Sequence, residues 1–278
     1  MPTKSPKFCA IAPTTYLEKY ASQSSTHLVL AHLVDIDQTY TDFYVKMAQR
    51  GDHIIMDNGA FELGESYEPS KLLELGKKCH ANTIVLPDYP FQPGIKTIEA
   101  AVKYFREIKE AGFKTLFVPQ SKVGDLEDWI QTYQWAISNP EVIDCIGMSI
   151  LGIPNALPHI PKSYARVVMT QLLIDRGLFR FYKYHHYLGL NSAPNVEIPA
   201  LIEMDAIDSC DSSNPIWSGI NGIRYNITNT DFMGIQKKYL REVDFNEKFV
   251  DNKTHIHDVI QYNLDITFDI FDDHKKYL

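Results

Sequence analysis

The stretch Thr83–Val118, TIVLPDYPFQPGIKTIEAAVKYFREIKEAGFKTLFV, contains a complete strand, helix and strand pattern. Its two ends, Thr83–Leu86 and Thr115–Val118, are short apolar runs of the kind that forms buried strands. Between them Ile95–Ala111 carries apolar residues at helical spacing, and Gly112 follows in the position that commonly ends a helix. This order predicts a βα unit of a parallel sheet.

The same alternation continues along the chain. We predict eight strands: Phe8–Ala12, His27–Leu33, His53–Met56, Thr83–Leu86, Thr115–Val118, Val142–Met148, His186–Leu190 and Ala206–Cys210. Further helical patterns lie at Pro69–Cys79, Asp125–Ser138 and Val196–Met204. Eight such units favour an α/β fold, a single (β/α)8 TIM-barrel domain over residues 1–278, with a doubly wound open sheet as the alternative.

Two segments go beyond a minimal barrel. Ile153–Tyr184 is longer than one crossover requires, so we interpret it as an elaborated βα unit. The tail is expected to form a short helical extension near Asp231–Arg241 and His255–Tyr262.

The composition limits the classes of function. The chain has 278 residues with 27 Lys and Arg against 35 Asp and Glu, a net charge of −8. A protein that mainly coats phosphates should be basic, although a local basic groove on an acidic body remains compatible. There is no apolar run of membrane-spanning length and no signal peptide, so a cytoplasmic protein with no membrane partner is expected.

The cysteines and histidines give little support for a metal site. Four cysteines occur, at Cys9, Cys79, Cys145 and Cys210, and no two of them form a CxxC pair. We expect them to be reduced and buried. His255 and His257 form an H-x-H pair without a nearby thiol, so no metal is expected there.

Polar residues follow several of the predicted strands, where barrel enzymes carry their chemistry. They are Asp57 and Asn58, then Asp88, Gln120, Gly147, Ser149 and Gly152, and finally Asp205, Asp208 and Asp211. Each has a structural alternative, since Asp-Asn-Gly and Leu-Pro-Asp-Tyr-Pro are ordinary turn sequences. Together they predict a pocket that binds hydrogen-bond donors, with paired carboxylates suited to acid and base chemistry.

Six segments in order resemble motifs of the queuine/archaeosine tRNA-guanine transglycosylase family, over about Ile54 to Gly222. MDNGAF resembles its Asp-Ser-Gly-Gly-Phe segment, LPDYP its base-recognising Asp segment and VPQS its Val-Gln-Gly segment. IGMSILG resembles its glycine-rich loop, HYLGL its His-Tyr-Leu-Met-Gly strand and DAIDSCD its nucleophile segment.

The resemblance implies roles for individual residues. Asp208 would attack the sugar carbon as nucleophile, and Asp57 would serve as general acid and base. The guanine-like ring would lie against the following set: Asp88, Gln120, Gly147, Met148, Ser149, Asn58 and Phe61, with Met56 packed nearby. The reaction would exchange guanine for a 7-deazaguanine of the preQ0 type through a covalent aspartyl intermediate, without ATP.

The differences from the family narrow the expected substrate. The family's zinc site has no counterpart, so we expect no cofactor, and no RNA-binding domain is appended. These features resemble the small branch of phages and bacterial modification clusters that acts on DNA, with tRNA as the alternative. A phage-encoded protein would work in the bacterial host's cytoplasm, and whether it forms a homodimer is left open.

The nucleic-acid contacts are expected from cations interleaved with aromatics in RGLFRFYKYHHY. The candidates are Arg176, Arg180, Lys183, His185, His186 and Arg224. An exposed helix face with aromatic packing is the structural alternative. Two rival functions are a metal-dependent barrel hydrolase and a catalytically inactive nucleic-acid-binding subunit.

Overall fold

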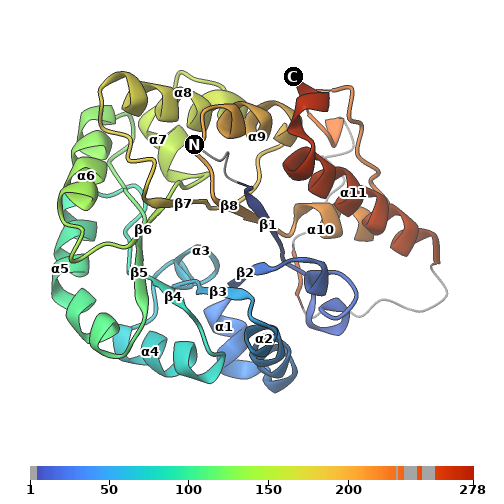
Figure 1. Cartoon of the computed structure of the whole chain (residues 1–278), viewed down its shortest axis with the longest axis horizontal. Helices are drawn as coiled ribbons and strands as arrows, with labels where there is room; N and C mark the ends of the chain where they lie inside the picture. The colour runs from blue at the N-terminus through green and yellow to red at the C-terminus, as the bar shows by residue number, and fades with distance from the viewer. Residues whose placement is uncertain (1–4, 230, 235–242, 246–253) are drawn as a thin grey trace.

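A computed structural model describes residues 5–229, 231–234, 243–245 and 254–278. Eight parallel strands form one sheet in the hydrogen-bonded order β1-β8-β7-β6-β5-β4-β3-β2. They are β1 (Lys7–Ala10), β2 (Thr26–Val29), β3 (His53–Met56), β4 (Thr83–Val85), β5 (Lys114–Phe117), β6 (Cys145–Gly147), β7 (Tyr184–Tyr187) and β8 (Ser209–Ser212). Strands β1 and β2 lie against each other, so the sheet closes on itself as a nearly complete barrel (Figure 1). The predicted TIM-barrel fold is confirmed.

Helices alternate with the strands, and most of them form the outer layer, whereas the short helix α3 lies inside the ring of strands in the view of Figure 1. They are α1 (Ala31–Ile36), α2 (Gln38–Arg50), α3 (Ala60–Leu63), α4 (Pro69–Lys78), α5 (Gly94–Glu110), α6 (Leu126–Ser138), α7 (Gly152–Ala156), α8 (Lys162–Asp175), α9 (Pro194–Glu203), α10 (Asn214–Ile220) and α11 (Thr254–Asp272). The predicted helix ends agree closely because local signals set them: Asp125 caps α6 by accepting from the Asp128 N–H, and Pro69 is the first residue of α4.

The elaborated unit between β6 and β7 consists of α7 and α8. In the C-terminal extension, α11 contains the predicted His255–Tyr262 helix and packs on α10, where a Cβ on Gly219 would lie 2.4 Å from Ile260 Cγ1. The helix predicted over Asp231–Arg241 falls largely outside the described residues. Among the helices that the structure describes, none combines the length and apolar character that crossing a bilayer requires.

Alternation along the strands separates the barrel interior from the layer between strands and helices. In β7, the His185 ring stacks on Phe179, with centroids 4.3 Å apart, and accepts or donates a 2.9 Å bond with the Tyr133 hydroxyl of α6. The next residue, His186, instead bonds to Ser209 and Asp211 on the inner side of β8. His185 is therefore part of the helix-facing core, and His186 lies inside the barrel.

Candidate active site

The carboxyl ends of the strands form the mouth of the barrel, where barrel enzymes place their active sites. Asp57 directly follows β3, and Asp88 and Gln120 come three residues after β4 and β5. In the view of Figure 1, the short helix α3 projects inside the ring of strands. The polar residues predicted to follow these three strands are therefore on one face of the barrel.

Three of them are joined by hydrogen bonds. The Asn58 amide donates to Asp88 Oδ1 at 2.7 Å, and the Gln120 amide donates to Asp88 Oδ2 at 2.6 Å. Burial raises the pKa of Asp88, while the two amide hydrogen bonds oppose that shift. The sequence reasoning expected these side chains to converge, and the structure brings them together.

The Gln120 carbonyl is an acceptor without a donor. Gln120 is only 1% exposed, and its buried Oε1 atom has no hydrogen-bond partner among the described residues. Gly152 stands beside it, and a Cβ at Gly152 would lie 2.8 Å from Oε1. A buried, unpaired carbonyl is costly, so a ligand N–H or O–H would satisfy it favourably.

A second polar group lies inside the barrel between β7 and β8. The Tyr184 hydroxyl donates to Ser209 Oγ at 2.7 Å, and Ser209 Oγ is 2.6 Å from His186 Nδ1. On the other side of the ring, His186 Nε2 is 3.0 Å from Asp211 Oδ1. Because a carboxylate only accepts, His186 donates from Nε2, and its Nδ1 accepts from Ser209.

Asp211 is the member of this hydrogen-bonded series that lies nearest the mouth of the barrel. Its Oδ1 also accepts the Gly189 N–H at 3.0 Å. Among the described residues Oδ2 accepts no hydrogen bond, and the side chain keeps 8% of its exposure. Two donors thus fix the carboxylate through one oxygen and leave the other for a ligand.

Asp208, the predicted nucleophile, lies at the opposite end. It precedes β8, its carbonyl accepts from the Lys7 N–H at 2.9 Å, and its Oδ2 accepts the His185 N–H at 2.7 Å. These bonds join the amino ends of β1, β7 and β8. The strand predicted over Ala206–Cys210 therefore began too early, because Ala206 and Ile207 are buried in the segment that leads into β8.

The predicted glycine-rich loop is occupied by the protein itself. The Met148 N–H donates to His186 O at 2.7 Å, and its carbonyl accepts from Leu188 and Arg166. Ser149 Oγ accepts from the Leu151 and Gly152 N–H groups at the start of α7. These bonds fix the backbone of the loop, and the predicted contact of Met148 and Ser149 with a ring stays a prediction.

Four further predicted positions have different outcomes. A Cβ at Gly147 would lie 2.8 Å from Leu116 Cδ2, so this glycine permits packing inside the barrel. Asp57 Oδ2 accepts the Gly59 N–H at 3.0 Å. Met56 is fully buried in the core. The side chain of Phe61 lies outside the described residues.

The predicted cationic stripe is not formed at the mouth. Arg176 makes a bidentate pair with Glu127, Arg180 donates to Gly177 O, and Lys183 is buried with its ammonium on Ile143 O. These three residues lie before β7, at the amino end of the barrel. His185 and His186 are fully buried, and the Arg224 guanidinium lies 3.6 Å from the centre of the Tyr262 ring. The six residues are therefore spread over different environments, and their role in nucleic-acid binding stays a prediction.

Metal ligands do not gather within the described part of the chain, where no group of three His, Cys, Asp or Glu could hold an ion. His257 contacts the Tyr20 hydroxyl through Nδ1. All four cysteines are free and buried, in line with the expectation for Cys9, Cys79, Cys145 and Cys210.

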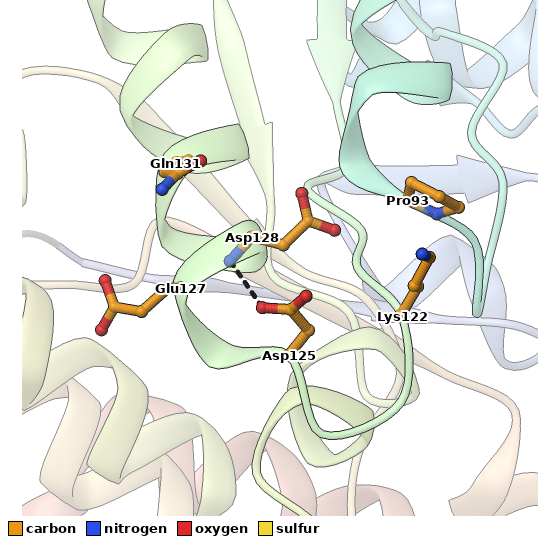
Figure 2. Close-up of a pocket in the computed structure, with 6 residues that line it drawn as sticks. All are labelled: Pro93, Lys122, Asp125, Glu127, Asp128 and Gln131. Atoms are coloured by element: carbon orange, nitrogen blue, oxygen red, sulfur yellow. Dashed lines mark hydrogen bonds between the residues drawn. The ribbon is translucent and has the colours of Figure 1, made fainter.

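A pocket of about 340 Å³ opens between the starts of α5 and α6 (Figure 2). It is lined by Pro93, Lys122, Asp125, Glu127, Asp128 and Gln131. Its carboxylates already have structural partners: Asp125 caps α6, Asp128 Oδ2 accepts from Gly94 at 2.9 Å, and Glu127 pairs with Arg176. The candidate active site is therefore the set of polar groups inside the barrel mouth rather than this pocket.

Two features of the mouth were missed by sequence reasoning. His32 follows β2 with its Nδ1 buried and unpartnered among the described residues, and burial lowers its pKa. Arg166 of α8 pairs with Glu197 of α9 and donates to the carbonyls of Met148 and Leu188. Neither has a motif, because both depend on the packing of distant elements.

No protein-family model and no curated protein matches the chain. Solved structures do. A fructose-bisphosphate aldolase from Campylobacter jejuni matches 97% of this chain and 90% of its own, with 7% identity and a TM-score of 0.52. An N-acetylneuraminate lyase from Mycoplasma synoviae matches 96% and 82%, with 11% identity and a TM-score of 0.43. The likeness to the aldolase shows the barrel fold alone.

The predicted guanine transglycosylase function is wrong. The neighbour on which this correction rests has a TM-score of 0.52 and is named as a fructose-bisphosphate aldolase, not as a transglycosylase. The site geometry agrees, because Asp57 and Asp208 lie at opposite ends of the barrel. The family resemblance of the motifs, the nucleic-acid partner and the cytoplasmic location stay predictions.

Proposed function

We propose that this chain is an enzyme with its active site at the barrel mouth, and that Asp211 acts there as a general base on a small polar substrate. The observation that carries the proposal is the way Asp211 is held. His186 and the Gly189 N–H bind Oδ1, and Oδ2 has no donor among the described residues. A base needs this combination of fixed geometry and an available lone pair.

The proton balance defines the reaction class. A substrate O–H or N–H gives its proton to Asp211 Oδ2, and the electron pair stays on that oxygen or nitrogen. The pair then forms a carbonyl or imine as the neighbouring bond to that carbon breaks. The electrons of the broken bond leave with the departing atom, and the proton held by Asp211 Oδ2 is returned to that atom. His186 keeps its Nε2 proton on Asp211 Oδ1 throughout, so it orients the base and stabilises its charge.

The acceptors around the mouth indicate the substrate's chemistry. Gln120 Oε1 is buried without a donor, and Asp57 adds a carboxylate at the end of β3. Acceptors of this kind bind hydroxyl, amine and amide N–H groups. We therefore expect a substrate with several hydrogen-bond donors, such as an amino alcohol or a polyhydroxylated compound.

A paired substitution tests the base. The protein is incubated with a pooled extract of small metabolites, and mass spectrometry follows which compounds disappear. We expect Asp211→Asn to slow the loss by about 10² to 10⁴-fold, the usual contribution of a general base. Asp208→Asn is the matched control, since it changes a carboxylate that directly precedes the amino end of the same strand.

Two results would contradict the proposal. One is turnover by Asp211→Asn at the wild-type rate. The other is an equal loss in Asp208→Asn and Asp211→Asn while both variants melt like the wild type, because the loss would then not depend on the mouth.

A further inference from the structure

The hydrogen-bonded series that ends at Asp211 begins at the other end of the barrel. Tyr184 and Ser209 are the first residues of β7 and β8, and the Tyr184 hydroxyl donates to Ser209 Oγ at 2.7 Å. Ser209 Oγ lies 2.6 Å from His186 Nδ1. The series then reaches the mouth through His186 Nε2, which lies 3.0 Å from Asp211 Oδ1.

The protons of this series all point toward the mouth. Ser209 has one hydroxyl proton, and among the described residues its oxygen has two partners, Tyr184 and His186. Because Tyr184 donates to that oxygen, the Ser209 proton goes to His186 Nδ1. His186 carries its own proton on Nε2 and donates it to Asp211. Each hydrogen bond polarises the next one, so the series acts as a unit.

The order Ser209, His186, Asp211 is that of a nucleophile triad, but the location of Ser209 excludes this role. In a triad the serine oxygen reaches the substrate. Here Ser209 is fully buried at the amino end of β8, and its oxygen is already bound by Tyr184 and His186. The group on which its hydroxyl acts is therefore the imidazole of His186.

The charge of this imidazole affects Asp211, because the His186 ring is fully buried beside the carboxylate. A second proton, on Nδ1, would create an imidazolium that binds the carboxylate as an ion pair and weakens it as a base. The titratable groups on the neighbouring strands are neutral. Burial lowers the pKa of His53 on β3 to about 4, and burial raises the pKa of the Cys9 and Cys145 thiols on β1 and β6.

We propose that Ser209 and Tyr184 are positioning residues that keep the His186 ring neutral and thereby preserve the basicity of Asp211. The proposal rests on the proposed function and deepens it, since it assigns control of the base to two residues remote from the mouth. A proton on Nδ1 would force Ser209 to turn its own proton away, and the described part of the chain offers that proton no other acceptor. Burial raises the pKa of Tyr184, so its hydroxyl keeps the proton that it donates.

Nitrogen-15 NMR of histidine-labelled protein measures the charge of the ring directly. The His186 signals are assigned by their loss in His186→Gln. A neutral imidazole gives two well-separated ring nitrogen signals, whereas an imidazolium gives two similar ones. We expect the wild type near neutral pH to give the separated pair, with the proton on Nε2. Imidazolium signals from His186 under these conditions would overturn the proposal.

A pH titration of the same signals measures the contribution of each hydroxyl. Ser209→Ala removes the hydrogen bond to Nδ1, and that bond stabilises the neutral ring. We expect the midpoint for His186 to rise by about 0.4 to 1 pH unit, the equivalent of one neutral hydrogen bond. Tyr184→Phe should raise the midpoint less, because the Ser209 donor remains. Ser209→Thr keeps a hydroxyl and should restore the wild-type midpoint.

Tyr133→Phe is the matched control for these variants. It also removes a buried hydroxyl from a histidine, because Tyr133 bonds to His185 Nε2 at 2.9 Å on the helix side of β7. The midpoint of His186 should not change in this control. A midpoint that Ser209→Ala leaves unchanged, or that Tyr133→Phe moves equally far, would refute the positioning role.

Turnover then connects the charge of the ring to the base. In the metabolite assay, Ser209→Ala should be slower than the wild type by about 2- to 10-fold at acidic pH, which is the fold-change that corresponds to the expected shift. At alkaline pH the His186 ring is neutral in both proteins, and the two rates should be equal. An equal loss at every pH would indicate a purely structural effect and would overturn the proposal.

Failure of this proposal and failure of the proposed function give different results. If Asp211→Asn keeps the wild-type turnover while Ser209→Ala shifts the His186 midpoint, the proposed base is wrong and the control of the ring's charge is confirmed. If Asp211→Asn loses turnover while Ser209→Ala leaves the midpoint unchanged, the base is confirmed and the positioning role is wrong.

Discussion

The buried ion pair behind the mouth gives a sharp stability prediction. Arg166 Nε and Nη2 donate to the two Glu197 oxygens at 2.7 and 2.6 Å, and the side chains are 1% and 0% exposed. Burial alone would lower the pKa of Arg166, but the attraction of Glu197 outweighs it and raises that pKa. Glu197→Gln would leave a buried guanidinium without its counter-charge.

The expected loss is about 3–5 kcal/mol, the cost of breaking a buried pair from one side. For a chain of this size it corresponds to a fall in melting temperature of roughly 6–20 °C. Arg166 Nη1 also donates to the carbonyls of Met148 and Leu188, after β6 and β7, at 3.2 and 3.0 Å. The ends of these strands should therefore lose order together with the pair.

Urea unfolding followed by circular dichroism measures the loss, and Glu127→Gln is the matched control. Glu127 makes the same bidentate contact with Arg176, at 3.0 and 2.9 Å, but on the surface. We expect that control to change the midpoint little, because exposed pairs contribute little. The double variant Arg166→Met/Glu197→Leu should recover most of the loss. If Glu197→Gln shifts the midpoint no more than Glu127→Gln, the reasoning about burial is refuted.

Two further predictions concern the core. Burial, with smaller contributions from Lys114 and His186, lowers the pKa of His53 from 6.5 to about 4. Between pH 6.5 and about 4 the unfolded chain binds a proton at His53 that the folded protein does not. The free energy of unfolding should therefore fall as the pH drops through this window. Urea titrations of His53→Gln should show a flatter slope of unfolding free energy against pH, and an unchanged slope would contradict the prediction. Gly219→Ala should lower the melting temperature, because the alanine Cβ would lie 2.7 Å from the Ile260 Cα. Calorimetry measures this change, and an unchanged melting temperature would disprove the close approach of α10 and α11.

Local signals made much of the fold predictable. The helix over Ile95–Ala111 was expected one residue later at each end than α5 (Gly94–Glu110), because its apolar spacing and the glycine after it are properties of the segment itself. Asn58, Asp88 and Gln120 were expected together for a similar reason. The carboxyl ends of neighbouring parallel strands must share one edge of the sheet, and the three residues follow β3, β4 and β5.

The roles of the aspartates could not be read in this way. Asp208 and Asp211 are three residues apart in DSCD, and both follow apolar residues. Which one reaches the mouth depends on where β8 begins, and that is set by the bond from Lys7 to the Asp208 carbonyl. A partner about 200 residues away in the chain fixes this register, and no local pattern records it.

By itself, then, the sequence determined the barrel: eight apolar runs alternating with helical segments can bury their faces in few other ways. The tertiary structure decided the chemistry. The pairing of β7 with β8 places the His186 side chain inside the barrel, against Asp211, and the His185 side chain on the helix side, against Phe179. The physical reason is that side chains alternate at every residue of a strand, so a shift of one position in pairing exchanges the interior of the barrel for its helical layer.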